Sequence, residues 1–112
     1  MPGDSGLIGL RDAMRTFTTE RKWDQYHDPK SLLLALVGEV GELSELFQWI
    51  PADNAVSRVA EQPRLQTRVG EEMADVLLYL VRLADVLEVD LEGAATRKLA
   101  SNARKYPVDK SN

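Results

Sequence analysis

Cysteine is absent from the 112 residues of the sequence, and histidine occurs only once, as His27. The absence of cysteine excludes disulfide frameworks, thiolate zinc sites and thiol nucleophiles. It also weakly favours a reducing compartment, so the cytoplasm is the default location. A di-iron carboxylate bundle normally needs two Glu-x-x-His pairs, which a single histidine cannot supply. Any metal site in this chain is therefore expected to use oxygen ligands.

Long apolar segments and an excess of positive charge are missing as well. The longest apolar run, Leu32 to Val37, is far shorter than the roughly 20 residues that cross a bilayer. The N-terminus has no basic and apolar signal segment, so we expect neither export nor a membrane partner. The net charge of -4 at pH 7 gives no support for binding to a nucleic-acid backbone. A charged small molecule remains compatible with this charge, because a bound cation can invert the local field.

The composition is that of a globular chain, with 44% hydrophobic and 29% charged residues. No segment has the period of a β-strand, and apolar residues recur instead at helical spacing in four segments. The sequence therefore predicts an all-α fold, a four-helix bundle that forms a single domain over residues 1–112. Its core is expected at about residues 5–107, followed by a frayed tail at residues 108–112.

Prolines and capping residues set the expected ends of the helices. Asp4 or Ser5 caps the first helix, and Pro29 disfavours helix at Asp28, just before the second. Pro51 stops the second helix, and the polar residues 52–62 are expected to form a loop with one short helical turn. The four expected helices cover about residues 5–21, 31–50, 63–87 and 91–106, and the second opens at Ser31 or at the residues just before it.

Acidic residues border the apolar stripes of the second and third expected helices. Glu39 and Glu42 lie one turn apart on the flank of the second helix, whereas Glu45 points further outward. Glu72 and Asp75 repeat the three-residue spacing at the edge of the third helix. The expected core seam of the second helix consists of Leu33, Leu36, Val40, Leu43 and Phe47.

Four carboxylates that converge beside a core need a cation, because unpaired they would repel one another and raise their own pKa values. Oxygen ligands without histidine or thiol suit Mg²⁺, or Mn²⁺ as a substitute, better than zinc or copper. A solvated acidic face is the alternative, and it would be preferred for any single pair. Two pairs on core-flanking edges reverse that preference. The sequence thus predicts a metal site formed by Glu39, Glu42, Glu72 and Asp75.

The order EVGE and then EEMAD, within LLLALVGEVGELSELFQW and DVLLYLVRLAD, resembles the all-α NTP pyrophosphatases of the MazG-like superfamily, in particular those that hydrolyse dCTP. The match runs from about Arg11 to Pro107 and includes KWDQYH upstream and RKLASNARKYP downstream. The resemblance implies hydrolysis of a nucleoside triphosphate, dCTP or a modified dCTP, to the monophosphate and pyrophosphate. It implies that the catalytic residues and Mg²⁺ ligands are Glu39, Glu42, Glu72 and Asp75.

The resemblance also implies a set of substrate contacts. The residues expected around the base and sugar are Trp23, His27, Trp49 and Tyr79, and those expected near the phosphates and nucleotide are Lys98 and Asn102. Trp49 follows Glu42 by seven residues, so a continuous helix would place both on one side. From the residues alone, each of these side chains also has a purely structural alternative. The aromatic rings could be packed, the histidine could make a hydrogen bond in a loop, and the lysine could be solvated. Met14 departs from the pattern, because the dCTP-specific relatives are expected to have a base-contacting histidine there.

Gly38 and Gly41 each cost about 1 kcal/mol relative to alanine inside a helix, which close contact with another helix or subunit would offset. The resemblance implies a homo-oligomer that completes the bundle, either a dimer or a tetramer made as a dimer of dimers. Two alternatives stay open. The first is the same chemistry on dUTP or another non-standard nucleotide, and the second is a non-catalytic acidic helical module that binds a structural cation or a basic partner.

Overall fold

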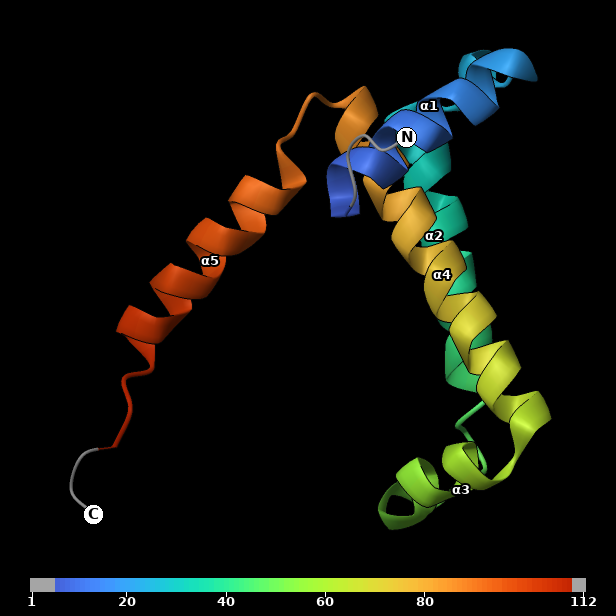
Figure 1. The fold of residues 1–112 in the computed structure, drawn as a ribbon, viewed down its shortest axis with the longest axis vertical. Coiled ribbons are helices and arrows are strands. Elements are labelled where there is room, and N and C mark those ends of the chain that lie inside the picture. Colours follow the sequence, from blue (N-terminus) through green and yellow to red (C-terminus); the bar gives the residue numbers. More distant parts are fainter. Residues whose placement is uncertain (1–5, 110–112) are drawn as a thin grey trace.

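The structure is a computed structural model that describes residues 6–109, and every regular element in this range is helical (Figure 1). The prediction of an all-α fold is confirmed. The expected cap at Asp4 or Ser5 and tail residues 110–112 lie outside the described residues. No helix within residues 6–109 has the length and apolar character that crossing a membrane requires. The elements are α1 (Gly6–Glu20), η1 (Asp24–Tyr26), α2 (Pro29–Glu45), η2 (Ala52–Asn54), α3 (Ala55–Glu61), α4 (Pro63–Val86) and α5 (Leu91–Lys105).

Three of the helices begin where proline and capping residues predicted. Asp28 has an extended backbone with ψ of 156° and caps α2 by accepting a hydrogen bond from the Ser31 amide. Pro63 occupies the first turn of α4. Asp90 caps α5 by accepting a hydrogen bond of 3.1 Å from the Gly93 amide.

Two expectations about helix ends were wrong. The helix α2 ends at Glu45 rather than near residue 50, because the next amides bond three residues back, as from Leu46 to the Leu43 carbonyl and from Phe47 to the Ser44 carbonyl. Residues 55–61, expected to lie in a loop with one short turn, form the two-turn helix α3. This segment, AVSRVAE, is rich in good helix formers and packs against α4.

The helices α2 and α4 lie side by side and form the centre of the structure (Figure 1). The helix α1 packs across α4 near one end of this pair, and α3 packs against α4 at the other end. Within residues 6–109, α5 packs along no other helix and runs away from the α2 and α4 pair. The radius of gyration is 17.5 Å, larger than the roughly 13 Å of a compact domain of about 100 residues.

The buried face of α2 matches the seam that the helical wheel predicted only in part, since Leu36 and Leu43 are half-buried. Leu32 is 2% exposed, whereas Leu33 and Val40 of the predicted seam are 50% and 41% exposed. The prediction was wrong for Leu33 and Val40 because α2 is apolar around much of its circumference, so periodicity alone does not show which face packs against α4. No heavy atom outside its own helix lies within 4 Å of a Cβ built at Gly38 or Gly41, so no other helix of the described chain approaches these glycines closely.

A broad apolar face of the α2 and α4 pair is left open in the isolated chain. We call this set of exposed side chains the open face. Single exposed apolar residues are ordinary, but these recur at helical spacing on each of the two helices, and apolar stripes of this kind are typical of an interaction surface. The open face consists of Leu33, Leu34, Val37 and Val40 on α2 and Met73, Leu77 and Leu80 on α4.

Candidate active site

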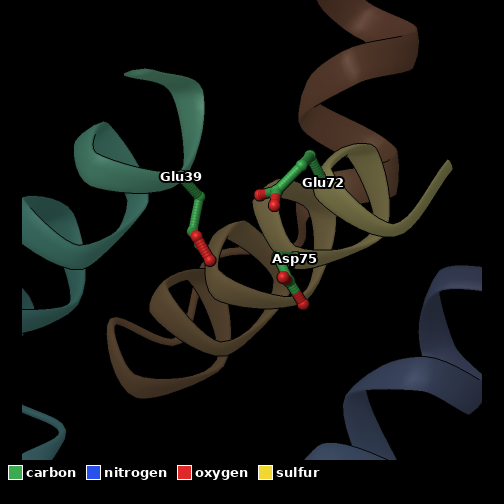
Figure 2. A group of neighbouring side chains, drawn as sticks. All are labelled: Glu39, Glu72 and Asp75. Carbon is green, nitrogen blue, oxygen red and sulfur yellow. The ribbon is translucent and has the colours of Figure 1, made fainter. Parts of the chain in front are cut away.

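Carboxylates from α2 and α4 converge between the two helices (Figure 2). Glu39 extends from α2 toward α4, where Glu72 and Asp75 lie one turn apart on the same side of the helix. One carboxylate oxygen from each of the three lies within 4.8 Å of the others, and all three residues are half-buried. The structure therefore brings together three of the four predicted metal ligands.

The electrostatics of this cluster are those of carboxylates that lack a counterion. A hydrogen bond with Glu42, burial and the charges of Glu42, Asp75 and Glu72 raise the pKa of Glu39 to about 7. Burial is the first cause that raises the pKa of Glu72, and the charges of Glu42 and Asp75 add to it. The Oε2 atom of Glu72 is buried and has no hydrogen-bond partner among the residues that the structure describes.

These observations fit a divalent cation bound between Glu39, Glu72 and Asp75. Octahedral Mg²⁺ holds neighbouring oxygen ligands about 3 Å apart, so the three carboxylate oxygens, which lie within 4.8 Å of one another, would draw closer together around the ion. A cation would give the buried Glu72 oxygen a partner and remove the repulsion that raises the pKa values. The fourth predicted ligand, Glu42, is exposed but close enough to Glu39 and Glu72 for its charge to act on both.

A cavity of about 360 Å³ adjoins the carboxylate cluster through Asp75. It lies between α1, α4 and the segment that follows α1. Three predicted substrate contacts, Trp23, His27 and Tyr79, line it, and Met14 lines it too. The remaining residues that line the cavity are Leu10, Ala13, Phe17, Thr18, Asp75 and Leu78.

The aromatic side of the cavity is held by contacts that sequence reasoning did not identify. The ring of Phe17 packs edge-on against Trp23, with centroids 5.6 Å apart. The guanidinium of Arg21 lies 3.6 Å from the centroid of Phe17. Phe17 follows Met14 by three residues, which places both on one side of α1. This spacing was the one signal in the sequence that could have placed Phe17 at the site.

The structure does not bring the other predicted contacts to the cavity of the same chain. Trp49 is 86% exposed, and the continuous helix on which its predicted position beside Glu42 depended ends at Glu45. Lys98 and Asn102 belong to α5, which runs away from the helix pair that carries the carboxylates (Figure 1). In the described part of the chain, none of these three residues lines the cavity.

A buried arginine connects the cavity to the outer end of α4. Arg82, which is 7% exposed, donates hydrogen bonds from Nε to His27 Nδ1 at 3.0 Å, from Nη2 to Asp24 at 2.9 Å and from Nη1 to Asp85 at 3.2 Å. Arg15 donates from Nε to the same Oδ2 atom of Asp85 and from Nη2 to Oδ1, and its hydrogen bond is the first cause that lowers the pKa of that carboxyl. Burial and the positive charge of Arg82 lower the pKa of His27, so its ring is neutral at pH 7. Sequence reasoning missed Arg82, although it stands out as a cation on the core-facing edge of α4.

Comparisons with known proteins identify the family and the fold of this chain. The sequence profile of the MazG-like family matches residues 35–112. The proteins named dCTP pyrophosphatase 1 from Bos taurus and Homo sapiens are 52% and 50% identical to the chain over 102 residues, which is 91% of this chain. The chain spans only 60% and 59% of the length of these two curated relatives. The crystal structure of a pyrophosphatase from Archaeoglobus fulgidus DSM 4304 has a TM-score of 0.82 and 38% identity, covering 96% of this chain and 98% of that chain.

Proposed function

This chain belongs to the MazG-like family, and we propose that it is a Mg²⁺-dependent nucleoside triphosphate pyrophosphatase. Its substrate is dCTP or a modified dCTP, which it hydrolyses between the α and β phosphates to the monophosphate and pyrophosphate. The observation that carries this proposal is that Asp75 belongs both to the carboxylate cluster and to the wall of the cavity. The name of the mammalian relatives, dCTP pyrophosphatase 1, supports the choice of substrate.

The four carboxylates form the metal site in this proposal, and Glu39 has a second role. Glu39, Glu42, Glu72 and Asp75 would hold Mg²⁺, which when bound neutralises phosphate charge and lowers the pKa of water. Glu39 also orients the attacking water, because a deprotonated carboxylate beside the ion can accept a hydrogen bond from that water. Mg²⁺ suits this set of oxygen ligands, and Mn²⁺ can substitute for it.

The cavity receives the base and sugar, because it is largely apolar and offers aromatic faces. Trp23 gives a stacking surface, and His27 and Tyr79 add polar groups at its edge. Met14 lines the same cavity but has only a weakly accepting thioether where a histidine was expected. This difference favours a second candidate function, the same reaction on dUTP or another non-standard nucleotide, in which the base is less tightly selected.

The direct test is to incubate a panel of nucleoside triphosphates with the protein and Mg²⁺ and to identify the products by chromatography. Pyrophosphate and monophosphate are expected, with dCTP or a modified dCTP turned over fastest. Orthophosphate in place of pyrophosphate would contradict the cleavage site. Turnover of none of the panel would favour the non-catalytic acidic module.

We propose further that the protein works as a homo-oligomer, a dimer or a tetramer made as a dimer of dimers. The open face supports this, because its apolar side chains and the exposed Gly38 and Gly41 offer a close-packing surface. The detached α5 supports a shared site in which Lys98 and Asn102 of one copy approach the phosphates bound by another copy. Such a site belongs in the cytoplasm with its substrate, since a highly charged triphosphate does not cross a bilayer unaided.

Mixing two inactive variants tests whether the site is shared. Glu72→Gln removes a ligand, and Lys98→Ala removes the phosphate contact. If the two residues serve one site from different copies, a mixed dimer has one intact site, and an equimolar mixture recovers about a quarter of the wild-type activity. Mixed oligomers without any recovered activity would show that both residues act within one chain.

A further inference from the structure

The guanidinium of Arg82 lies behind the cavity and bonds directly to a ring that lines it. Its Nε donates to Nδ1 of His27 across 3.0 Å, joining residues 55 positions apart in the chain. The same guanidinium is held from two other sides by Asp24 and Asp85. The hydroxyl of Thr18, which is fully buried, lies 3.0 Å from the Arg15 carbonyl and 3.4 Å from the Asp24 carboxylate and can donate to either, while Arg15 fixes Asp85. Arg82 is therefore immobilised at every branch of its guanidinium.

This bond determines where the imidazole of His27 holds its proton. A guanidinium is a donor only and remains protonated in proteins. Nδ1 of His27 must therefore present a lone pair to Arg82, and the proton of the neutral ring must be on Nε2. Because Nδ1 is occupied, the Nε2 hydrogen is the one polar group that the ring can offer to a molecule in the cavity.

The charges around His27 support a neutral ring. Arg82 opposes a second positive charge beside it, and burial of the ring acts in the same direction. Asp24 would favour the charged ring, but its carboxylate accepts from Arg82 and its effect is smaller. A neutral ring held with Nε2 protonated can donate a hydrogen bond but cannot act as a general acid of the imidazolium type.

We infer that Arg82 is a positioning residue, which holds His27 as the Nε2-protonated tautomer so that it donates a hydrogen bond to an oxygen of the bound nucleoside. This inference rests on the proposed function, because it takes the cavity to be the nucleoside site. The oxygen is either a base carbonyl or a sugar hydroxyl, since both are acceptors in a pyrimidine nucleoside. Loss of Arg82 would release the ring to both tautomers, one of which presents a lone pair to that oxygen.

The single histidine makes the tautomer directly measurable. A long-range proton–nitrogen correlation spectrum of the full chain labelled with ¹⁵N-histidine shows which ring nitrogen carries the proton, without substrate or metal. We expect Nε2 protonated and Nδ1 unprotonated at pH 7, and a tautomer mixture in Arg82→Lys, which keeps the charge but loses the Nε donor. The matched control is Arg15→Gln, which loses a bond to Asp85 but has none with His27 and should give the wild-type spectrum. Protonated Nδ1 in the wild type, or an unchanged spectrum in Arg82→Lys, would overturn the inference.

Kinetics in a double-mutant cycle test whether Arg82 acts through His27. Arg82→Lys should raise KM for dCTP by roughly two- to tenfold, the worth of one hydrogen bond, with kcat nearly unchanged. In the His27→Gln background the same change should leave KM unaltered, because the glutamine amide donates without tautomer control. A further loss in that background would mean that Arg82 acts on the fold instead.

Two substrate analogues identify the oxygen that accepts the bond. If it is the base carbonyl, the KM effect of Arg82→Lys should vanish with 2-thio-dCTP, whose sulfur is a poor acceptor. If it is the sugar hydroxyl, the effect should vanish with dideoxy-CTP. Retention of the full effect with both analogues would refute a nucleoside oxygen as the acceptor. Absence of turnover on every nucleotide would overturn the proposed function, whereas the spectrum would still decide the role of Arg82.

Discussion

Binding of Mg²⁺ at pH 7 should release about half a proton per site from Glu39. The pKa of Glu39 is about 7 in the cluster without a cation, so about half of these carboxyls are protonated at pH 7. A metal ligand must be deprotonated, and binding therefore expels that proton. The release should rise to about nine-tenths of a proton at pH 6 and approach zero at pH 9.

Titration calorimetry in two buffers of different ionisation enthalpy measures this release, because the expelled proton adds the heat of buffer protonation to the observed enthalpy. Glu39→Gln should bind Mg²⁺ more weakly and release less proton than the wild type, and what remains comes from Glu72, whose pKa is also raised. Glu45→Gln is the matched control, since Glu45 lies on the same helix but is exposed and outside the three-residue cluster. A binding enthalpy that does not depend on the buffer at pH 7, or an undiminished release in Glu39→Gln, would refute the assignment of Glu39.

The protonation of Glu39 also makes the stability of the folded protein depend on pH. The folded-state pKa of Glu39 is raised, so the folded protein binds more protons than the unfolded chain between pH 4.5 and about 7. The contribution of this group to stability is therefore full below that window and is lost as the pH rises through it. Mg²⁺ should accordingly stabilise the protein more at pH 8 than at pH 5. At a free concentration of 100 times Kd it adds about 2.7 kcal/mol, or on the order of 10 °C or more in Tm for a chain of this size. Equal shifts in Tm at both pH values would contradict a cation site on these carboxylates.

Four further predictions follow from the site, the fold and the ion pairs. Asp75→Asn should abolish turnover while the far-ultraviolet circular dichroism spectrum stays helical, and full activity would exclude Asp75 as a ligand. Trp23→Ala should raise KM by roughly five- to 150-fold, since a base stacked on an aromatic ring is worth ~1 to 3 kcal/mol; an unchanged KM in steady-state assays would place the base elsewhere. Val37→Asp, on the open face, should lower the mass measured by light scattering to that of a smaller species, and an unaltered mass would show that this face is not an interface. Arg15→Gln should raise the lowered pKa of Asp85, so that its Tm deficit against wild type is present at neutral pH and closes as the pH falls through that pKa.

Local patterns predicted the helices and the carboxylate cluster because both depend on a few neighbouring residues. Asp28 with Pro29 fixes the start of α2 whatever surrounds it. Glu72 and Asp75 face the same way because a three-residue spacing is nearly one turn, and this remains true in any helical fold. What the spacing alone could not supply is the pairing of α4 with α2, which came from the shared acidic pattern at Glu39.

The features that sequence reasoning missed depend on contacts between distant segments. Arg82 had no recognisable neighbour in the sequence, since its partners His27 and Asp24 lie 55 and 58 residues away. Trp49 was misplaced because the wheel assumed a continuous helix, whereas bonds between residues three apart end α2 four residues before it. Neither error could be corrected by a longer sequence window, because the deciding contacts are not periodic.

The helix α5 shows a different limit of prediction from sequence. Even the structure of the single chain does not show which helix covers its apolar side. Its apolar Leu99 is 72% exposed, and α5 packs along no other helix in the described part of the chain. A helix of 15 residues is marginal in water when it has no packing partner. An amphipathic pattern indicates that a face will be buried, but it is the same pattern whether the covering helix belongs to this chain or to a second copy. Loss of activity in a Lys98 variant is expected whether this lysine serves the site of its own chain or that of a second copy. Only mixing it with a Glu72 variant separates the two cases.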